Sequence, residues 1–173
     1  MAAVAEKLSF LEFQAKYEHG DRSYEYWYGQ AMPKGMPTWI HGLLQRIVME
    51  LLTEAGYISG SEVELRIIPE AHPKPDVIGT KGEVEDPYPT KAVDVVVEIL
   101  SKDDSAPYVL EKCQAYRTWG FEYIYVVNPE SRQVFRWTGT ALELSTTLTS
   151  IPATRIWERL DEALRRTRQE PRT

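Results

Sequence analysis

The sequence is poor in the residues and runs that mark several common protein classes. Its 173 residues include one cysteine, Cys113, which excludes an internal disulfide framework and a zinc cluster built from cysteines. No run of about 18 apolar residues occurs, so no transmembrane helix is expected. The first seven residues lack the basic start and the long apolar stretch of a secretion signal. The cytoplasm is therefore the expected location.

Positive charge is scarce as well. The chain has 20 Lys and Arg residues against 26 Asp and Glu residues, a formal net charge of −6. Because affinity for DNA comes largely from neutralising phosphates, this balance disfavours nucleic-acid binding by the surface as a whole. The net charge does not exclude a local basic patch that binds DNA, and part of the acidic excess would be metal ligands. The sequence also contains no glycine-rich phosphate loop, HExxH motif or nucleophile elbow.

What is present is the composition of an ordinary soluble domain, with 43% apolar and 27% charged residues. A single domain of this length can bury a substantial core. The order of predicted elements indicates an α/β (α+β) fold, in which helices flank one mixed β-sheet. Within this single domain, residues 1–173, we expect an N-terminal helix and strand over 9–32, a core over 38–145 and a C-terminal helix over 154–168.

Local signals place these elements. A capping box formed by Ser9 and Glu12 opens a helix that reaches about Tyr17. Thr38 is the expected N-cap of a long helix with an apolar stripe that ends near Gly56. Strands are predicted over 23–32, 62–68, 76–79, 92–100, 122–127 and 133–137, and further helices over 108–119 and from 155 onward.

The most apolar of these strands, 92–100, contains a carboxylate. Glu98 lies among aliphatic residues, where its burial is costly unless a metal or another cation neutralises it. Period-two alternation places Glu98 on the same face as Asp94 and Val96. Asp76, after Pro75, opens a neighbouring short strand. If the two strands pair, the Asp76 and Glu98 carboxylates lie within the roughly 4–6 Å over which they perturb each other's ionisation.

A carboxylate pair of this kind suits Mg²⁺ or Mn²⁺. Mg²⁺ takes oxygen ligands from one or two carboxylates, lowers the pKa of a coordinated water and neutralises charge that develops at phosphorus. The helix that follows the apolar strand packs back near Glu98. Lys112 on that helix is therefore a candidate to orient the water or to stabilise the transition-state charge.

Each of these residues, taken singly, also has an ordinary explanation. Asp76 could cap a turn, and Glu98 could pair with an arginine across the sheet, for instance Arg66. Lys112 could be a solvated helix residue. His41 lies beside an apolar stripe, where a histidine is more often partly buried than functional. The joint occurrence of the residues favours a catalytic site.

Several motifs follow one another with a fairly specific spacing. They are Pro75-Asp76, Val96-Val97-Glu98-Ile99-Leu100-Ser101, Glu111-Lys112 with Tyr116 and Gly120, and Glu122-Tyr123-Ile124-Tyr125-Val126-Val127-Asn128-Pro129-Glu130. The ordered set resembles the PD-(D/E)XK nuclease superfamily, and more closely its Uma-type family of putative restriction endonucleases. The resemblance spans roughly residues 24–160.

The resemblance implies a restriction-endonuclease-like fold and an endonuclease that uses Mg²⁺ or Mn²⁺ to hydrolyse phosphodiester bonds of DNA. It implies that Asp76 and Glu98 hold the metal, with the Ile99 carbonyl as a further ligand, and that Lys112 is the catalytic lysine. The remaining pocket residues that it implies are Glu25 and His41. A homodimer is expected by analogy with enzymes that cut both strands through two-fold symmetry.

Three positions depart from the family pattern. Leu100 stands where the superfamily usually has its lysine, so activity depends on the placement of Lys112. Asn128 replaces the usual Asp and Tyr125 the usual Trp, and both are expected to be structural. A second function therefore stays open, a catalytically weak or inactive nuclease-fold module for binding or assembly. A third is a metal-dependent hydrolase acting on another phosphate substrate.

Overall fold

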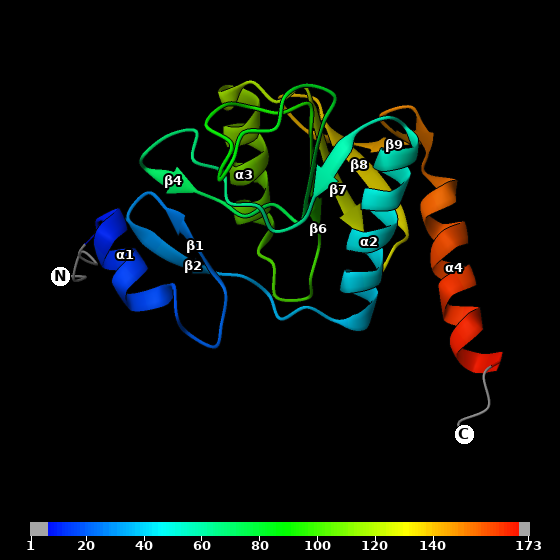
Figure 1. The fold of residues 1–173 in the computed structure, drawn as a ribbon. Coiled ribbons are helices and arrows are strands. Elements are labelled where there is room, and N and C mark those ends of the chain that lie inside the picture. The colour runs from blue at the N-terminus through cyan, green and yellow to red at the C-terminus, as the bar shows by residue number, and fades with distance from the viewer. Residues whose placement is uncertain (1–6, 170–173) are drawn as a thin grey trace.

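A mixed six-stranded sheet forms the centre of the computed structural model, which describes residues 7–169 and their side chains through residue 166. The strands lie in the order β3-β5-β6-β7-β8-β9 (Figure 1). Their bounds are Ile58–Gly60, Val77–Thr80, Val95–Ile99, Tyr123–Asn128, Gln133–Trp137 and Leu142–Ser145. β6 and β7 pair in parallel, and all other neighbours are antiparallel. The predicted fold class, a mixed sheet flanked by helices in one domain, is confirmed.

Helices cover both faces of this sheet. α2 (Trp39–Glu54) and α4 (Thr154–Gln169) pack on one face, where Val95, Val97 and Ile99 of β6 point. α3 (Ala106–Trp119) covers the other face, to which Val96 belongs. The predicted alternation along β6 is therefore confirmed. It directs Glu98, which has the parity of Val96, toward α3.

The signals at the helix ends are also confirmed. Thr38 Oγ1 accepts a hydrogen bond from His41 N at 3.2 Å, and this cap starts α2. Gly120 ends α3 as predicted, with a φ of 103°. The left-handed conformation at that position favours glycine because L side chains are strained in it. α3 begins at Ala106 after the cap Ser105, two residues before the predicted start at 108.

A smaller three-stranded sheet, in the order β2-β1-β4, lies beside α1 (Phe10–Tyr17) at the N-terminal side of the molecule (Figure 1). Its strands are Tyr24–Trp27, Gln30–Pro33 and Ala71–His72. The expectation of one strand over 23–32 is wrong, because the segment folds back as a hairpin. Tyr28 and Gly29 have φ angles of 48° and 83°, the consecutive positive values of a type I′ turn. The capping box of α1 is confirmed.

The strand predicted over 62–68 is also wrong. Three amides of this segment donate to proline carbonyls: Glu62 N to Pro75 O, Leu65 N to Pro73 O and Arg66 N to Pro89 O. Proline has no N–H to donate in return, so a β-ladder cannot be completed there. The apolar strand 92–100 is shorter than predicted, because only residues 95–99 pair.

Five short strands were not predicted. β3, β4 and β9 have been described above, and β10 (Thr147–Leu148) and β11 (Ile151–Pro152) form a two-stranded sheet near α4. Two to four residues carry too few alternating positions to be told from loop. Among the described residues, no helix is both long enough and apolar enough to cross a membrane.

Candidate active site

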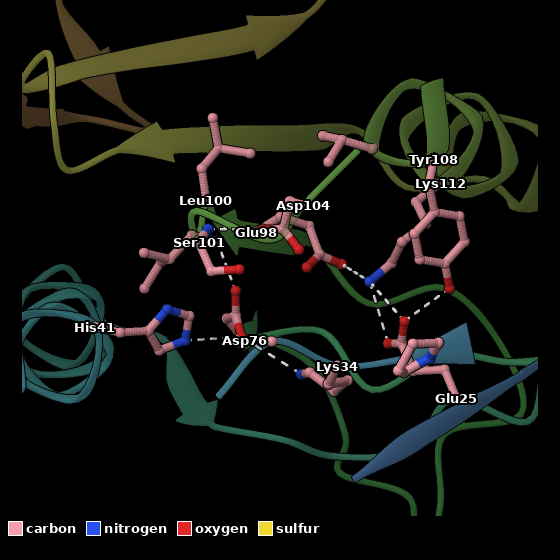
Figure 2. A pocket seen from close by; sticks show the side chains of 14 residues that line it. Glu25, Lys34, His41, Asp76, Glu98, Leu100, Ser101, Asp104, Tyr108 and Lys112 are labelled. Carbon is pink, nitrogen blue, oxygen red and sulfur yellow. Dashed lines mark hydrogen bonds and ion pairs between the residues drawn. The ribbon is translucent and has the colours of Figure 1, made fainter. Parts of the chain in front are cut away.

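One pocket gathers side chains from both sheets and two helices. The end of β6 provides Glu98, the residue before β5 provides Asp76, and β1 provides Glu25. The first turn of α2 contributes His41, and α3 contributes Lys112. These are all five residues that the sequence singled out, and Figure 2 shows them turned toward one another. The structure thus brings the whole predicted set together, while the role of each residue remains a prediction.

Strand pairing explains why the two acids meet. β5 pairs with β6 in an antiparallel register that sets Val77 opposite Val97. Asp76 precedes Val77 and Glu98 follows Val97, so the two carboxylates adjoin the same end of the strand pair. Residues opposite each other in an antiparallel pair point to the same face. The neighbouring strands expected from the sequence therefore do pair.

Asp76 is held as an anion. Its side chain is buried, Oδ2 accepts a hydrogen bond from Ile99 N at 2.6 Å, and Oδ1 lies 3.2 Å from His41 Nε2 and 3.4 Å from Lys34 Nζ. Burial alone would raise the pKa of this carboxyl, but the hydrogen bond with His41 and the charge of Lys34 outweigh it. The pKa of Asp76 therefore lies well below its ordinary value. The simple turn cap considered as an alternative does not describe this residue.

Glu98 is buried in a different balance of charges. Its Oε1 lies 2.7 Å from Lys112 Nζ and accepts a hydrogen bond from the Tyr116 hydroxyl at 2.5 Å. Burial raises the pKa of Glu98 to about 7; the charge of Lys112 opposes this rise, and the charges of Asp76 and Glu25 add to it. Burial and the two neighbouring carboxylates therefore raise the pKa of Glu98 by more than the charge of Lys112 lowers it.

The arginine considered as a partner of Glu98 lies elsewhere. Arg66 Nε donates to Glu64 Oε1 at 2.7 Å, and its guanidinium stacks 3.8 Å from the centre of the Tyr88 ring. The alternative in which Arg66 neutralises Glu98 is therefore wrong.

Lys112 is a buried ammonium, so the alternative of a solvated helix lysine is wrong as well. Only 5% of the residue is exposed, and Nζ lies 3.1 Å from both carboxylate oxygens of Glu25. Burial would lower the pKa of Lys112, but the charges of Glu25 and Glu98 raise it well above its ordinary value. Glu25 is itself fixed by the Lys74 N–H at 2.6 Å and the Tyr108 hydroxyl at 2.8 Å. Lys112 is thus a charged donor on the middle of α3, held in place by two buried carboxylates.

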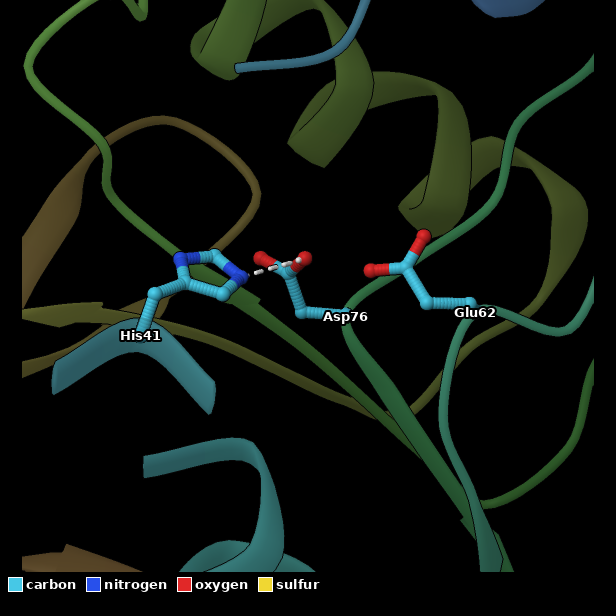
Figure 3. Close-up of side chains that lie close together, drawn as sticks. All are labelled: His41, Glu62 and Asp76. Carbon is cyan, nitrogen blue, oxygen red and sulfur yellow. Dashed lines mark hydrogen bonds and ion pairs between the residues drawn. The ribbon is translucent and has the colours of Figure 1, made fainter. Parts of the chain in front are cut away.

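The sequence did not point to a second cluster, which shares His41 and Asp76 with the pocket and adds Glu62 beside it. His41, Glu62 and Asp76 each offer a ligand atom, and these atoms lie within 4.8 Å of one another (Figure 3). Lys34 Nζ lies 2.7 Å from Glu62 Oε2, and Gln45 Nε2 donates to Glu62 Oε1 at 2.8 Å. Lys34 lies in an irregular segment and Glu62 at the start of a wrongly predicted strand, so no local signal marked either as a site residue.

The donor set fits a divalent cation. Lys34 and Lys112 contact four carboxylates between them, so those acids outnumber the two ammonium groups. Ser101 Oγ, which also lines the pocket, is buried and has no hydrogen-bond partner among the described residues. Buried oxygen donors with an excess of negative charge are the environment in which hard cations such as Mg²⁺ bind.

Comparisons with known proteins identify the family and agree with the fold. A family model described as Uma2, putative restriction endonuclease, matches residues 9–163. A solved structure described as a putative nuclease belonging to DUF820, from Anabaena variabilis, matches with a TM-score of 0.72 and 17% identity. The match covers 88% of this chain and 99% of that chain, and at this identity it shows the fold alone. No curated protein sequence matches the chain significantly.

Proposed function

This chain belongs to the Uma2 family of putative restriction endonucleases, and on that premise we propose that it hydrolyses phosphodiester bonds of DNA with Mg²⁺ or Mn²⁺. One observation carries the proposal. Two buried carboxylates, Asp76 and Glu98, share the end of a strand pair, and Lys112 lies 2.7 Å from the second of them. Buried acids whose pKa values are displaced in opposite directions are typical of active sites.

In this proposal Asp76 and Glu98 hold the metal. A bound Mg²⁺ supplies a water of lowered pKa and neutralises charge on a phosphoryl oxygen. The Ile99 N–H and the His41 ring fix the Asp76 carboxylate, and the Tyr116 hydroxyl fixes that of Glu98. Groups that orient ligands in this way commonly sustain metal affinity. The Ile99 carbonyl, implied as a further ligand, belongs to a residue that lines the same pocket.

Lys112 is the proposed donor to the scissile phosphate or to the attacking water. It lies on α3 rather than two residues after Glu98, where Leu100 stands. The ammonium nevertheless reaches Glu98, and it is also held by Glu25, whose carboxylate the Tyr108 hydroxyl fixes. A charged donor fixed in advance costs little reorganisation when negative charge develops. Placement on a helix therefore provides the same chemistry as placement on the strand.

The test is nicking of supercoiled plasmid with Mg²⁺ or Mn²⁺. Asp76→Asn and Glu98→Gln should each lower the rate by more than about 100-fold, because even partners that only orient a ligand are worth 10–100-fold. Glu64→Gln is the matched control, since Glu64 is as buried as Glu98, at 8% exposure, and lies outside the pocket. Folding of each variant is checked by circular dichroism. Retention of cleavage by a folded Asp76 or Glu98 variant would refute the assignment.

One observation favours a second candidate, a nuclease-fold module that binds or assembles without useful catalysis. Lys112 already lies between Glu25 and Glu98, and it pairs with both of them without a metal. Calorimetric titration with Mn²⁺ separates the candidates, because the module requires no divalent cation. We retain the nuclease as the leading function, since a single lysine does not offset the two carboxylates that it contacts.

A further inference from the structure

Lys34 is bonded as completely as an ammonium group can be. Its Nζ lies 2.7 Å from Glu62 Oε2, 2.6 Å from the Lys74 carbonyl oxygen and 3.4 Å from Asp76 Oδ1. An ammonium has three N–H donors, and here three acceptors surround it. Its side chain is 13% exposed, so these contacts lie largely out of water. Lys34 is therefore a fixed cation of the pocket rather than a mobile surface lysine.

The backbone that carries Lys34 is fixed too. Lys34 N donates to Ser23 O at 2.9 Å, which ties the residue to the start of the N-terminal hairpin. The next residue, Gly35, packs so closely on Ser101 that an added Cβ would collide with the Ser101 hydroxyl. Both anchors limit how far the ammonium can withdraw from the pocket.

Asp76 divides the pocket into two sides. Its Oδ2 faces Ile99 N, at the end of β6 that also carries Glu98. Its Oδ1 faces His41 and Lys34, the side on which Glu62 completes the three-residue cluster (Figure 3). A carboxylate with a cation site on each side is the arrangement of two-metal hydrolases, whose ions lie roughly 3.5–4 Å apart. In this chain the Lys34 ammonium contacts Asp76 on the Oδ1 side, whereas the ammonium on the other side, that of Lys112, contacts Glu98.

We propose that Lys34 takes the place of a second metal ion, so that this protein works with one divalent cation and one tethered ammonium. The inference rests on the proposed function, because the first cation is the one assigned to Asp76 and Glu98. The second side has the ligand chemistry of a metal site in His41, Glu62 and Asp76. The Lys34 ammonium occupies this side and contacts both Asp76 and Glu62. Positive charge is therefore present there without an ion bound from solution.

Metal stoichiometry tests this proposal on the full-length protein without substrate. Titration calorimetry with Mn²⁺ alone should give one ion per chain for the wild type and two for Lys34→Ala, which removes the ammonium and opens its space. The two ions in the variant share Asp76, so electron paramagnetic resonance should show a spin-coupled Mn²⁺ pair. Lys102→Ala is the matched control, because it removes the same charge from an exposed position beside Ser101. This control should bind one ion.

Each outcome decides the matter. Two ions in the wild type, or one ion in a folded Lys34→Ala protein, would overturn the role of Lys34. If neither protein binds Mn²⁺, the metal site of the proposed function fails first, and the two failures are thus distinguishable. Should Lys34→Ala not fold, reductive methylation of the wild type serves instead. Lys34 should stay unmodified with and without Mn²⁺ while Lys102 reacts, and methylation of Lys34 on adding Mn²⁺ would show that the metal displaces it.

Discussion

At the scale of single residues, the pocket is a set of carboxylates neutralised unequally. Lys34 contacts Asp76 and Glu62, whereas Lys112 contacts Glu25 and Glu98. The burial penalty on Asp76 is overcome by His41 and Lys34, but that on Glu98 is not overcome by Lys112. Two acids of one strand pair therefore differ in ionisation near neutral pH. Glu98 is the group whose charge most depends on what else enters the site.

The raised pKa of Glu98 predicts a particular dependence of stability on pH. Glu98 is protonated below about 7 in the folded protein, against 4.5 for an ordinary Glu, so the folded state binds the extra proton between these values. Its contribution to stability is fully present below pH 4.5 and is lost as pH rises through 7. The shift corresponds to about 3 kcal/mol.

Urea unfolding of the metal-free protein measures this effect. The free energy of unfolding of the wild type, relative to Glu98→Gln, should fall by about 3 kcal/mol between pH 4.5 and 7. The difference between the two proteins isolates Glu98, because the titration of His41, whose pKa is also raised, is common to both. Parallel pH profiles for the two proteins would show that Glu98 is not shifted.

The sequence supplied the acids of the site for a physical reason. A carboxylate in an aliphatic strand is expensive, so Glu98 was visible as an anomaly, and the ordered motifs then led to Asp76 and Lys112. Lys34 and Glu62 had no such signal, because charged residues in loops are ordinary. Their importance arises only when the hairpin and the loop before β4 fold against Asp76.

At the scale of elements, the site depends on how the N-terminal hairpin meets the main sheet. β1 brings Glu25 to Lys112, and the end of β2 leads into Lys34, so one turn positions two of the charged groups. That turn was missed from the sequence because the alternation of Tyr24, Tyr26 and Tyr28 with Glu25 and Trp27 was extended through Met32 as one strand. The positive φ angles at Tyr28 and Gly29 instead reverse the chain.

Gly29→Ala should therefore destabilise the protein. Gly29 has a φ of 83°, and an added Cβ would lie 2.8 Å from Lys7 Cβ. The left-handed conformation alone costs an alanine roughly 1–2 kcal/mol. Gly42→Ala is the matched control, because Gly42 lies in α2 with nothing within 4 Å of an added Cβ. It should stabilise by about 0.5–1 kcal/mol. Urea unfolding measures both, and equal effects of the two changes would contradict this account of the turn.

Prediction worked best for elements with strong local signals. α1 and α2 start at capping side chains that the sequence predicts, α3 ends at the predicted Gly120, and β6 is buried on both faces, so the positions of these elements follow from sequence. The segment 62–68 has strand-like residues, yet its partners are proline carbonyls that cannot complete a ladder. Whether a β-branched run pairs depends on its neighbour in space, which a single sequence does not state.

At the scale of the whole molecule, the negative net charge opposes DNA binding less strongly once a metal ion is bound at the site. The formal net charge is −6, and at the site the ammonium groups of Lys34 and Lys112 contact four carboxylates, so acidic groups outnumber basic ones there. A divalent cation would offset part of this excess. Metal binding would thus remove much of the local repulsion of a phosphate, and binding of DNA should depend on the metal.

The proposed homodimer makes a sharper prediction about products. One chain offers a single candidate pocket with this carboxylate and lysine set among its described residues. One pocket cuts one strand at a time, so linear plasmid from a single encounter needs two pockets related by two-fold symmetry. Wild-type chains mixed and refolded with Glu98→Gln chains would form dimers that have one active pocket.

In such mixtures, linear product formed in one binding event should fall with the square of the wild-type fraction, whereas nicked circles should persist. Gel densitometry under single-turnover conditions measures both products. Glu64→Gln chains provide the control, because they should dilute neither product. If linear plasmid instead falls in direct proportion to the wild-type fraction, one chain cuts both strands, and the dimer has no catalytic role.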